Sequence, residues 1–233
     1  MKEPVEYELD VLADLNNYNR WIAESFHPFS SGSLIEFGAG IGTLSALFLP
    51  YSRKLTLVEP SPELFKKLET KFAADSQITL IQNSLELAFE KTAEKDFDTA
   101  LLSNVLEHIE DDQAALQMVS KRLRPGGHLL VFVPALQALY SDLDRAVGHH
   151  RRYHLQDLKQ KAQAAGFEII KLQYFDWIGA LLWWLANIIL KRTNINPKSA
   201  KLYDQVGIPI TRQIERLFPP PFGKNIILVA RKI

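Results

Sequence analysis

The chain has no cysteine among its 233 residues, which excludes disulfide bonds, thiolate metal sites and a cysteine nucleophile. It also has no excess of either charge. Its 27 Lys and Arg residues balance 27 Asp and Glu residues, so the whole chain has no net field that would attract nucleic acid. Long hydrophobic runs are missing too. The longest, residues 177–190, would form a helix of about 21 Å, shorter than the roughly 30 Å hydrocarbon core of a bilayer.

The first residues, MKEPVEYELD, are acidic and contain no apolar segment. We therefore expect no signal peptide and a cytoplasmic location. Hydrophobic residues make up 47% of the chain and charged residues 23%, which is typical of a globular protein. A chain of this length can bury one well-packed core, and we predict a single domain over residues 1–233.

Short apolar segments alternate with amphipathic ones in the first half of the chain. The segments SLIEF, KLTLVEP, ITLIQ, TALLS and HLLVFVP predict five strands, with helices such as SPELFKKLETKFA and DDQAALQMVSKRL between them. Strands that are apolar on both sides indicate a parallel sheet covered on both faces. The fold class is therefore α/β, a Rossmann-like three-layer sandwich. EIIKLQYF and NIILVARKI predict a sixth and a seventh strand.

Three other segments of the chain lie outside this alternation of strands and helices. Residues 1–30 form a leading helical segment, with one helix expected over residues 9–26. Residues 135–153 form an irregular polar loop after the fifth strand, and residues 176–223 form a long insertion between the last two strands. Ligands of open parallel sheets bind beyond the carboxyl ends of the strands. We therefore expect the loop at 135–153 on the ligand side of the sheet.

The segment EFGAGIG follows the first strand and places glycines at alternate positions 38, 40 and 42. Glu59 ends the second strand, about twenty residues after the glycines, where a carboxylate can accept hydrogen bonds from ribose hydroxyls. A dinucleotide fingerprint would need glycine at position 43, where Thr43 stands. A glycine turn alone could be only a tight turn, but Glu36 and Glu59 together favour a nucleotide-like ligand.

These motifs resemble the class I S-adenosylmethionine-dependent methyltransferases. The resemblance rests on EFGAGIG, LTLVE, NSLE, FDTALLSNVLEHIED and LRPGGHLLVFVP, and on the closing strand NIILVARK. It implies a seven-stranded, mostly parallel sheet whose antiparallel last strand is inserted, and S-adenosylmethionine as the cofactor. NNYNRWIAE and GHHRRYHLQDLKQKAQAAGF look like a bacterial branch near the type 11 and type 12 methyltransferases, which is often grouped with enzymes that modify glycans or lipids.

The resemblance also implies roles for individual residues. Glu36 would anchor the ammonium of the cofactor, and Glu59 would hold its ribose diol. Asn83 stands where an aspartate is usual, and its carbonyl oxygen can still accept from the adenine amine. Trp21 is expected in the core. The residues expected to bind the cofactor are Tyr18, Glu36, Gly38, Gly40, Gly42, Glu59, Pro60, Asn83, Ser84, Leu85, Asn104 and Val105.

The loop DLDRAVGHHRRYH offers acid–base groups for an acceptor hydroxyl, which must lose its proton. His149, His150 and Tyr153 are the catalytic candidates, because a histidine titrates near neutral pH. Arg151 and Arg152 could bind a phosphate or carboxylate of the substrate. The alternative is that the loop folds on itself through Arg–Asp pairs and packs Tyr153. No group of His, Asp and Glu has metal-ligand spacing, so we predict no metal.

The segment WIGALLWWLANIIL, residues 177–190, is apolar on all sides. A helix of this kind is buried, pairs with another chain or meets lipid. We favour burial under a cap or in a homodimer, while Lys191 and Arg192 could touch anionic headgroups in a peripheral membrane contact. Trp183 and Trp184 are candidate substrate-binding residues, and at least one of them should be buried.

The sequence thus predicts a methyltransferase that acts on a small-molecule or lipid- or sugar-linked acceptor, with oxygen as the favoured acceptor atom. Two alternatives stay open: a cofactor-binding regulatory or partner module without turnover, and a nucleotide-dependent oxidoreductase. Nucleic acid is not expected as the acceptor, because the charge is balanced and SNVL, not an NPPY-type tetrad, follows the fourth strand.

Overall fold

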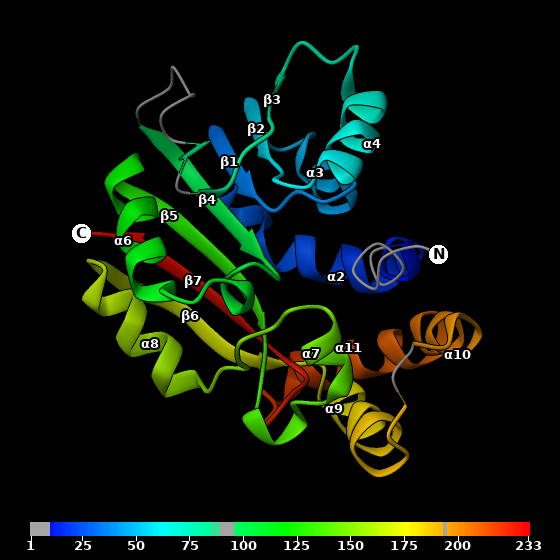
Figure 1. Cartoon of the computed structure of the whole chain (residues 1–233). Coiled ribbons are helices and arrows are strands. Elements are labelled where there is room, and N and C mark those ends of the chain that lie inside the picture. Colours follow the sequence, from blue (N-terminus) through cyan, green and yellow to red (C-terminus); the bar gives the residue numbers. More distant parts are fainter. Residues whose placement is uncertain (1–9, 86, 89–95, 193–194) are drawn as a thin grey trace.

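A seven-stranded sheet forms the centre of the molecule (Figure 1). The computed structural model describes residues 10–85, 87–88, 96–192 and 195–233. The strand order is β3-β2-β1-β4-β5-β7-β6, in which β7 runs antiparallel to both neighbours and the other pairs are parallel. The predicted sandwich with an inserted antiparallel last strand is confirmed. The strands are β1 (Ser33–Phe37), β2 (Lys54–Val58), β3 (Ile78–Ile81), β4 (Phe97–Ser103), β5 (Leu123–Pro134), β6 (Phe167–Phe175) and β7 (Asn225–Lys232).

Different helices cover the two faces of the sheet, because successive side chains of a strand point to opposite faces. Leu34 and Leu101 pack with the apolar sides of α2, α3 and α4. Ile35 and Leu102 pack on the other face with α6 and α8. The helices of the two layers are α2 (Asn16–Phe26), α3 (Thr43–Phe48), α4 (Pro62–Phe72), α6 (Asp112–Arg122) and α8 (Leu155–Ala164).

The start of α4 follows the local signals of its sequence. The Ser61 hydroxyl accepts a hydrogen bond from the backbone N–H of Leu64 at 3.4 Å, and Pro62 occupies the first turn. The start of β5 differs from the prediction. The strand begins at Leu123 and not at His128, and its pairing with β4 is irregular between these two residues. The residues of the expected RPGG turn therefore form an irregular part of the strand β5.

The leading segment is not the single helix that its apolar spacing predicts. Residues 10–13 are helical, the chain turns at Asp14 and Leu15, and α2 begins at Asn16. The carboxylate of Asp204 accepts hydrogen bonds from the backbone N–H groups of Asn17 at 3.2 Å and Tyr18 at 2.8 Å. The first turn of α2 is thus capped by an acid from the insertion far along the chain, so no local sequence signal marks the break.

The loop at residues 135–153 is more ordered than its irregular sequence suggests. It contains the 3₁₀ turn η3 (Gln137–Leu139) and the short helix α7 (Asp142–Ala146). Asp144 accepts from both the backbone N–H and the hydroxyl of Ser141 at 2.8 Å, which forms a capping box at the start of α7. This capping fixes the backbone that leads to His149.

The insertion at residues 176–223, here called the cap, is helical. It comprises α9 (Trp177–Trp183), which continues as the π-helix η4 (Trp184–Ile189), then α10 (Pro197–Leu202), the π-helix η5 (Tyr203–Gly207) and α11 (Ile208–Leu217). Figure 1 shows α9 and α10 projecting from the end of the sheet near α7. Within the described residues, each helix is too short or too polar to traverse a bilayer.

Buried acids hold the cap together. Asp176 accepts from the backbone N–H of Gly179 at 3.0 Å and from the hydroxyl of Tyr203 at 2.6 Å. Glu215 accepts from the backbone N–H of Trp177 at 2.9 Å. Together with Asp204, these carboxylates join the start of α9, the end of the cap and the leading helix α2.

Replacement of Asp204 by Ala should destabilise the protein by about 1–3 kcal/mol, because two buried amides lose their acceptor. Thermal unfolding and urea titration would measure the change. Glu69→Ala, which removes an exposed acid from α4, is the control and should leave the free energy of unfolding nearly unchanged. An unchanged stability of Asp204→Ala would mean that the capping of α2 contributes nothing.

Candidate functional site

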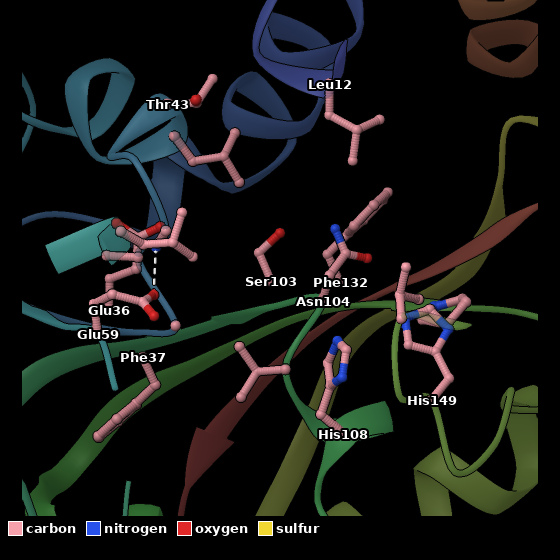
Figure 2. Close-up of a pocket in the computed structure, with 18 of the residues that line it drawn as sticks. Leu12, Glu36, Phe37, Thr43, Glu59, Ser103, Asn104, His108, Phe132 and His149 are labelled. Carbon is pink, nitrogen blue, oxygen red and sulfur yellow. Dashed lines mark hydrogen bonds between the residues drawn. The ribbon is translucent and has the colours of Figure 1, made fainter. Parts of the chain in front are cut away.

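A cavity of about 670 Å³ opens at the carboxyl ends of the parallel strands. Residues that end or follow β1, β2, β4 and β5 line it, as expected for an open α/β sheet. Figure 2 shows Glu36 and Glu59 at one end of the cavity, Ser103 and Asn104 in the middle, and His108 and His149 at the other end. The carboxylates and the histidines thus face different parts of one elongated space.

The glycine segment is held in place by the acid at the tip of β2. The backbone N–H of Gly40 donates to Glu59 Oε2 at 2.8 Å, and the backbone N–H of Ser61 donates to Glu59 Oε1 at 2.9 Å (Figure 2 draws the first bond). Gly38 has a φ of +62° and lies so close to Val105 that a Cβ would come within 2.6 Å of Val105 Cγ2. A side chain at Gly38 would therefore displace Val105, which lines the cavity.

Gly42 has a structural role in the packing of α3 against α4. It is not among the described residues that line the cavity. Its φ is +73°, and an added Cβ would lie 2.4 Å from a ring carbon of Phe72 and 2.8 Å from Leu68 Cδ1. The glycine thus permits a tight start of α3 against α4.

The two carboxylates at this end are unusual in their burial. Glu36 is only 3% exposed and Glu59 only 4%. Burial raises the pKa of Glu36 to about 7, although a hydrogen bond from the Ser45 hydroxyl at 2.6 Å opposes the shift. Burial also raises the pKa of Glu59, against the hydrogen bonds from Ser61 and Gly40. A cation or hydroxyl donors placed beside these groups would stabilise their charged forms.

The remaining residues expected around the cofactor mostly lie in the cavity wall. Asn83 uses its side-chain oxygen in a 3.2 Å bond from the backbone N–H of Ser84, which leaves its second lone pair for a ligand. Asn104 has a φ of +53°, a conformation that is uncommon for a residue with a side chain and is often found at functional sites. The lining residues of this set are Tyr18, Pro60, Asn83, Ser84, Leu85, Asn104 and Val105.

Tyr18 closes the cavity from α2. It is 6% exposed, and its hydroxyl donates to Asn225 Oδ1 at 2.9 Å. Trp21, one turn further along, stacks on Phe175 with ring centroids 3.8 Å apart and lies in the core, as predicted. The leading helix therefore contributes one residue to the cavity and one to the packing beneath it.

At the opposite end, His149 is oriented by a buried carboxylate. Its Nδ1 lies 2.9 Å from Asp144 Oδ1. The guanidinium of Arg152 donates to both oxygens of Asp144, at 2.8 Å and 3.1 Å. Burial alone would raise the pKa of Asp144, but the bond with His149 and the charge of Arg152 lower it to about 2. Asp144 therefore stays ionised and orients the ring through Nδ1. On the other side of the ring, Nε2 lies 3.9 Å from Oε1 of Glu107.

Glu107, His108 and His149 approach one another at this end of the cavity. Their ligand atoms all lie within 4.8 Å of one another, and the rings of His108 and His149 meet edge to face at 4.7 Å. The sequence predicts no metal, because His149 belongs to a different loop from the other two and no spacing links them. The structure shows that folding creates a group of three with metal-ligand spacing.

Other candidates from the acceptor-side loop lie in different places. His150 and Arg152 line the cavity. Tyr153 does not: it is 2% exposed, and its hydroxyl donates to Asp112 Oδ2 at 2.8 Å and to the carbonyl of Leu106 at 3.1 Å. Arg151 pairs with Asp112 at 3.0 Å and with the carbonyl of Glu110. Both residues therefore fix the loop through Asp112, which is the structural role that the sequence left open.

The two neighbouring tryptophans face in different directions. Trp183 lines the cavity, donates from Nε1 to the carbonyl of Leu139 at 3.0 Å, and stacks with the guanidinium of Arg152 at 4.8 Å. Trp184 is 46% exposed. The expectation that at least one of the two indoles would be buried is not met, because Trp183 is half-buried at the cavity edge and Trp184 is exposed.

Sequence reasoning missed the contribution of β7. Lys224 and Asn225 line the cavity, and Lys224 Nζ lies 4.5 Å from the ring of Tyr18 and 3.5 Å from Asp176 Oδ2. Since β7 is antiparallel, its first residues lie at the edge where the parallel strands end. The predicted strand direction could have identified these two positions.

Comparison with known proteins identifies the family of the chain. A family model described as a methyltransferase domain matches residues 12–172. The chain belongs to this methyltransferase family. A ubiquinone biosynthesis O-methyltransferase from Xylella fastidiosa (strain 9a5c) is 30% identical over 109 residues, which cover 45% of this chain and 42% of that enzyme. A protein from Dictyostelium discoideum named "Probable polyketide synthase 40" is 28% identical over 145 residues, 52% of this chain and 6% of that protein. The chain thus spans less than half the length of either relative.

Solved structures share the fold. An S-adenosylmethionine-dependent methyltransferase from Mesorhizobium loti has a TM-score of 0.61 at 15% identity, covering 90% of this chain and 95% of that one. Phosphoethanolamine N-methyltransferase 2 from Haemonchus contortus, in complex with S-adenosyl-L-methionine, has a TM-score of 0.62 at 15% identity over 93% of this chain and 52% of that one. The methyltransferase is S-adenosylmethionine-dependent.

The residues at the carboxylate end fit this cofactor chemically. Each oxygen of Glu59 accepts one backbone N–H, so further lone pairs remain for two ribose hydroxyls. The buried Glu36 suits an ammonium group, since a positive charge offsets the cost of ionising a carboxyl there. Residues Gly38 to Gly40 line the same cavity as both acids.

Glu59→Ala should weaken cofactor binding by roughly 10- to 150-fold for each lost hydrogen bond to the charged acceptor. Calorimetry with S-adenosylhomocysteine would measure the affinity. Glu63→Ala, which removes a nearby exposed acid, is the control and should bind as the natural chain does. Tight binding of NAD by the natural chain, with none of S-adenosylhomocysteine, would contradict the assignment of the site.

Cofactor affinity should rise with pH below about 7 and level off above it. The pKa of Glu36 is raised to about 7, so the empty site holds this carboxyl protonated at lower pH, and binding an ammonium then requires release of that proton. One proton released corresponds to a tenfold change in affinity per pH unit. Glu36→Gln should bind more weakly at pH 8 and lose the slope. Retention of the slope in Glu36→Gln would assign it to another group.

Proposed function

We propose that the enzyme transfers the methyl group of S-adenosylmethionine to a hydroxyl of a small-molecule or lipid- or sugar-linked acceptor, with His149 as the general base. The observation that carries this proposal is the Asp144–His149 pair at the end of the cavity opposite the carboxylates. An acceptor hydroxyl must lose a proton during methyl transfer, and a histidine oriented by a buried acid is suited to take it.

The cofactor supplies an activated methyl group and a neutral thioether leaving group. The chain supplies position and proton transfer. Glu36 and Glu59 orient the cofactor from one end, while the acceptor hydroxyl lies within reach of His149 at the other. His149 would take the proton that the acceptor hydroxyl loses as its oxygen receives the methyl group. The imidazolium that results is stabilised by Asp144, whose charge is maintained by Arg152.

Two features support the choice of acceptor. The name of the Xylella relative supports oxygen as the acceptor atom and a small molecule as the acceptor class. The acceptor end of the cavity combines the polar groups His108, His149 and Arg152 with the indole of Trp183. A polar group attached to a flat or apolar body would match this lining.

The function can be tested without knowing the acceptor in advance. The enzyme and S-adenosylmethionine with a labelled methyl group would be incubated with extracts of cells that lack the gene. Label should appear in one organic-soluble or small-molecule fraction and stay attached as an O-methyl group by mass spectrometry. Label found only on nitrogen or carbon would contradict O-methylation, and label in nucleic acid would contradict the acceptor class.

His149→Ala should lower turnover of that acceptor by about 10²–10⁴-fold, the usual contribution of a general base. Cofactor affinity should stay unchanged, because His149 lies at the far end of the cavity. His154→Ala, in an exposed residue at the start of α8, is the matched control. Equal turnover of His149→Ala and His154→Ala would make the loop structural.

The same assay separates acid–base catalysis from metal catalysis. With His149 as the base, chelation by EDTA should leave turnover unchanged. Loss of activity with EDTA and its recovery with a divalent cation would instead assign Glu107, His108 and His149 to a metal and contradict the proposed role of His149.

A further inference from the structure

The outer surface of the cap is unusually apolar. Of the sixteen exposed large hydrophobic side chains in the described part of the chain, twelve belong to the cap. A gathering of exposed apolar side chains in one segment usually marks an interaction surface. We call these twelve side chains, together with the exposed cations of the cap, the cap surface. They are Leu181, Leu182, Trp184, Leu185, Ile189, Leu190, Leu202, Val206, Ile210, Ile214, Leu217 and Phe218.

The exposed charged residues of the cap itself are of one sign. The cap contains three acids, Asp176, Asp204 and Glu215, and all three are buried in the hydrogen bonds that hold the cap together. Its exposed charged residues are therefore all cations, in a chain whose net charge is zero. These cations are Lys191, Arg192, Lys198, Lys201 and Arg216. Lys198 and Lys201 line a second cavity together with Asp10 and Asp14 of the leading segment, so the unbalanced positive charge is that of Lys191, Arg192 and Arg216.

We propose that the cap surface docks on an anionic lipid bilayer. Apolar side chains of a helix that lies on a membrane enter the boundary between headgroups and acyl chains, while its basic side chains contact lipid phosphates. The cap provides both components on short helices that cannot span. The exposed charges of the cap itself are all positive. They complement an anionic surface, and we therefore favour a bilayer as the partner.

A second copy of the chain fits the cap surface less well. In a two-fold dimer the same patch meets itself, so Lys191, Arg192 and their neighbours would face cations of the other copy. Lysine is also depleted in the cores of protein interfaces. The unbalanced charge that favours a bilayer therefore disfavours a homodimer through this face.

Docking would also bring the cavity to the membrane. Trp183 lines the cavity, and the next residue, Trp184, lies on the cap surface. The cap thus forms a wall of the site on one side and the docking surface on the other. This last step, that the acceptor is drawn from the membrane, rests on the proposed function, whereas docking itself does not.

Sedimentation with vesicles tests the proposal. The natural chain should bind vesicles of phosphatidylcholine mixed with phosphatidylglycerol, bind phosphatidylcholine alone more weakly, and dissociate as salt is raised. Lys191→Ala with Arg192→Ala should weaken binding roughly 30-fold, since each basic side chain strengthens it roughly fivefold. Leu185→Ser with Leu190→Ser should weaken it on the order of tenfold or more.

Matched controls remove the same groups elsewhere. Arg53→Ala with Lys66→Ala removes two exposed cations outside the cap, and Ile170→Ser with Ile233→Ser removes two exposed apolar side chains. Both double variants should bind vesicles as the natural chain does. Binding of S-adenosylhomocysteine by every variant would show that the fold and the cofactor site are intact, so that this test is independent of acceptor turnover.

Three results would overturn the proposal. The first is failure of the natural chain to bind the anionic vesicles. The second is equal binding by the cap variants and their controls. The third is a natural chain that is dimeric by analytical ultracentrifugation and becomes monomeric in Leu185→Ser with Leu190→Ser, which would make the cap surface a subunit interface.

Discussion

Buried carboxylates with backbone and side-chain donors around them hold this molecule in its working shape. A buried acid is costly unless hydrogen bonds or cations compensate it, so each one fixes the segments that supply its donors. Glu59 ties the tip of β2 to the glycine segment, Asp144 ties α7 to Arg152 and His149, and Asp204 ties the cap to α2. Both ends of the cavity are therefore set before any ligand arrives.

The parts of the site that sequence could predict are those with a local signature. The strand–glycine–helix segment carries Glu36 and Gly38 together, and Glu59 ends the next strand, so topology alone brings these residues to one edge of the sheet. The alternation of strand and helix segments along the chain predicted the parallel sheet for the same reason. Each such prediction depends on neighbours in sequence or on adjacent parallel strands.

The parts that sequence could not predict depend on contacts across the chain. Asp204, in the cap, caps the first turn of α2, where the leading segment is interrupted. Asp112 binds Tyr153 and Arg151, which therefore fix the loop and do not serve as groups of the cavity. Gly42 follows the glycine pattern, yet the ring of Phe72 decides its role. In each case a contact between distant parts of the chain decides the role of the residue, and the sequence alone does not show that contact.

The zero net charge of the chain illustrates the same limit. Composition treats charge as though it were spread evenly, but folding buries the three acids of the cap and leaves five of its six cations exposed. A local basic surface can thus exist on a neutral protein. Its exposed leucines and isoleucines separate that surface from a nucleic-acid site, because phosphate contacts are made by polar and charged groups and gain nothing from apolar side chains between them. A lipid interface uses both kinds of side chain, so the buried acids that stabilise the cap also define what its outer face can meet.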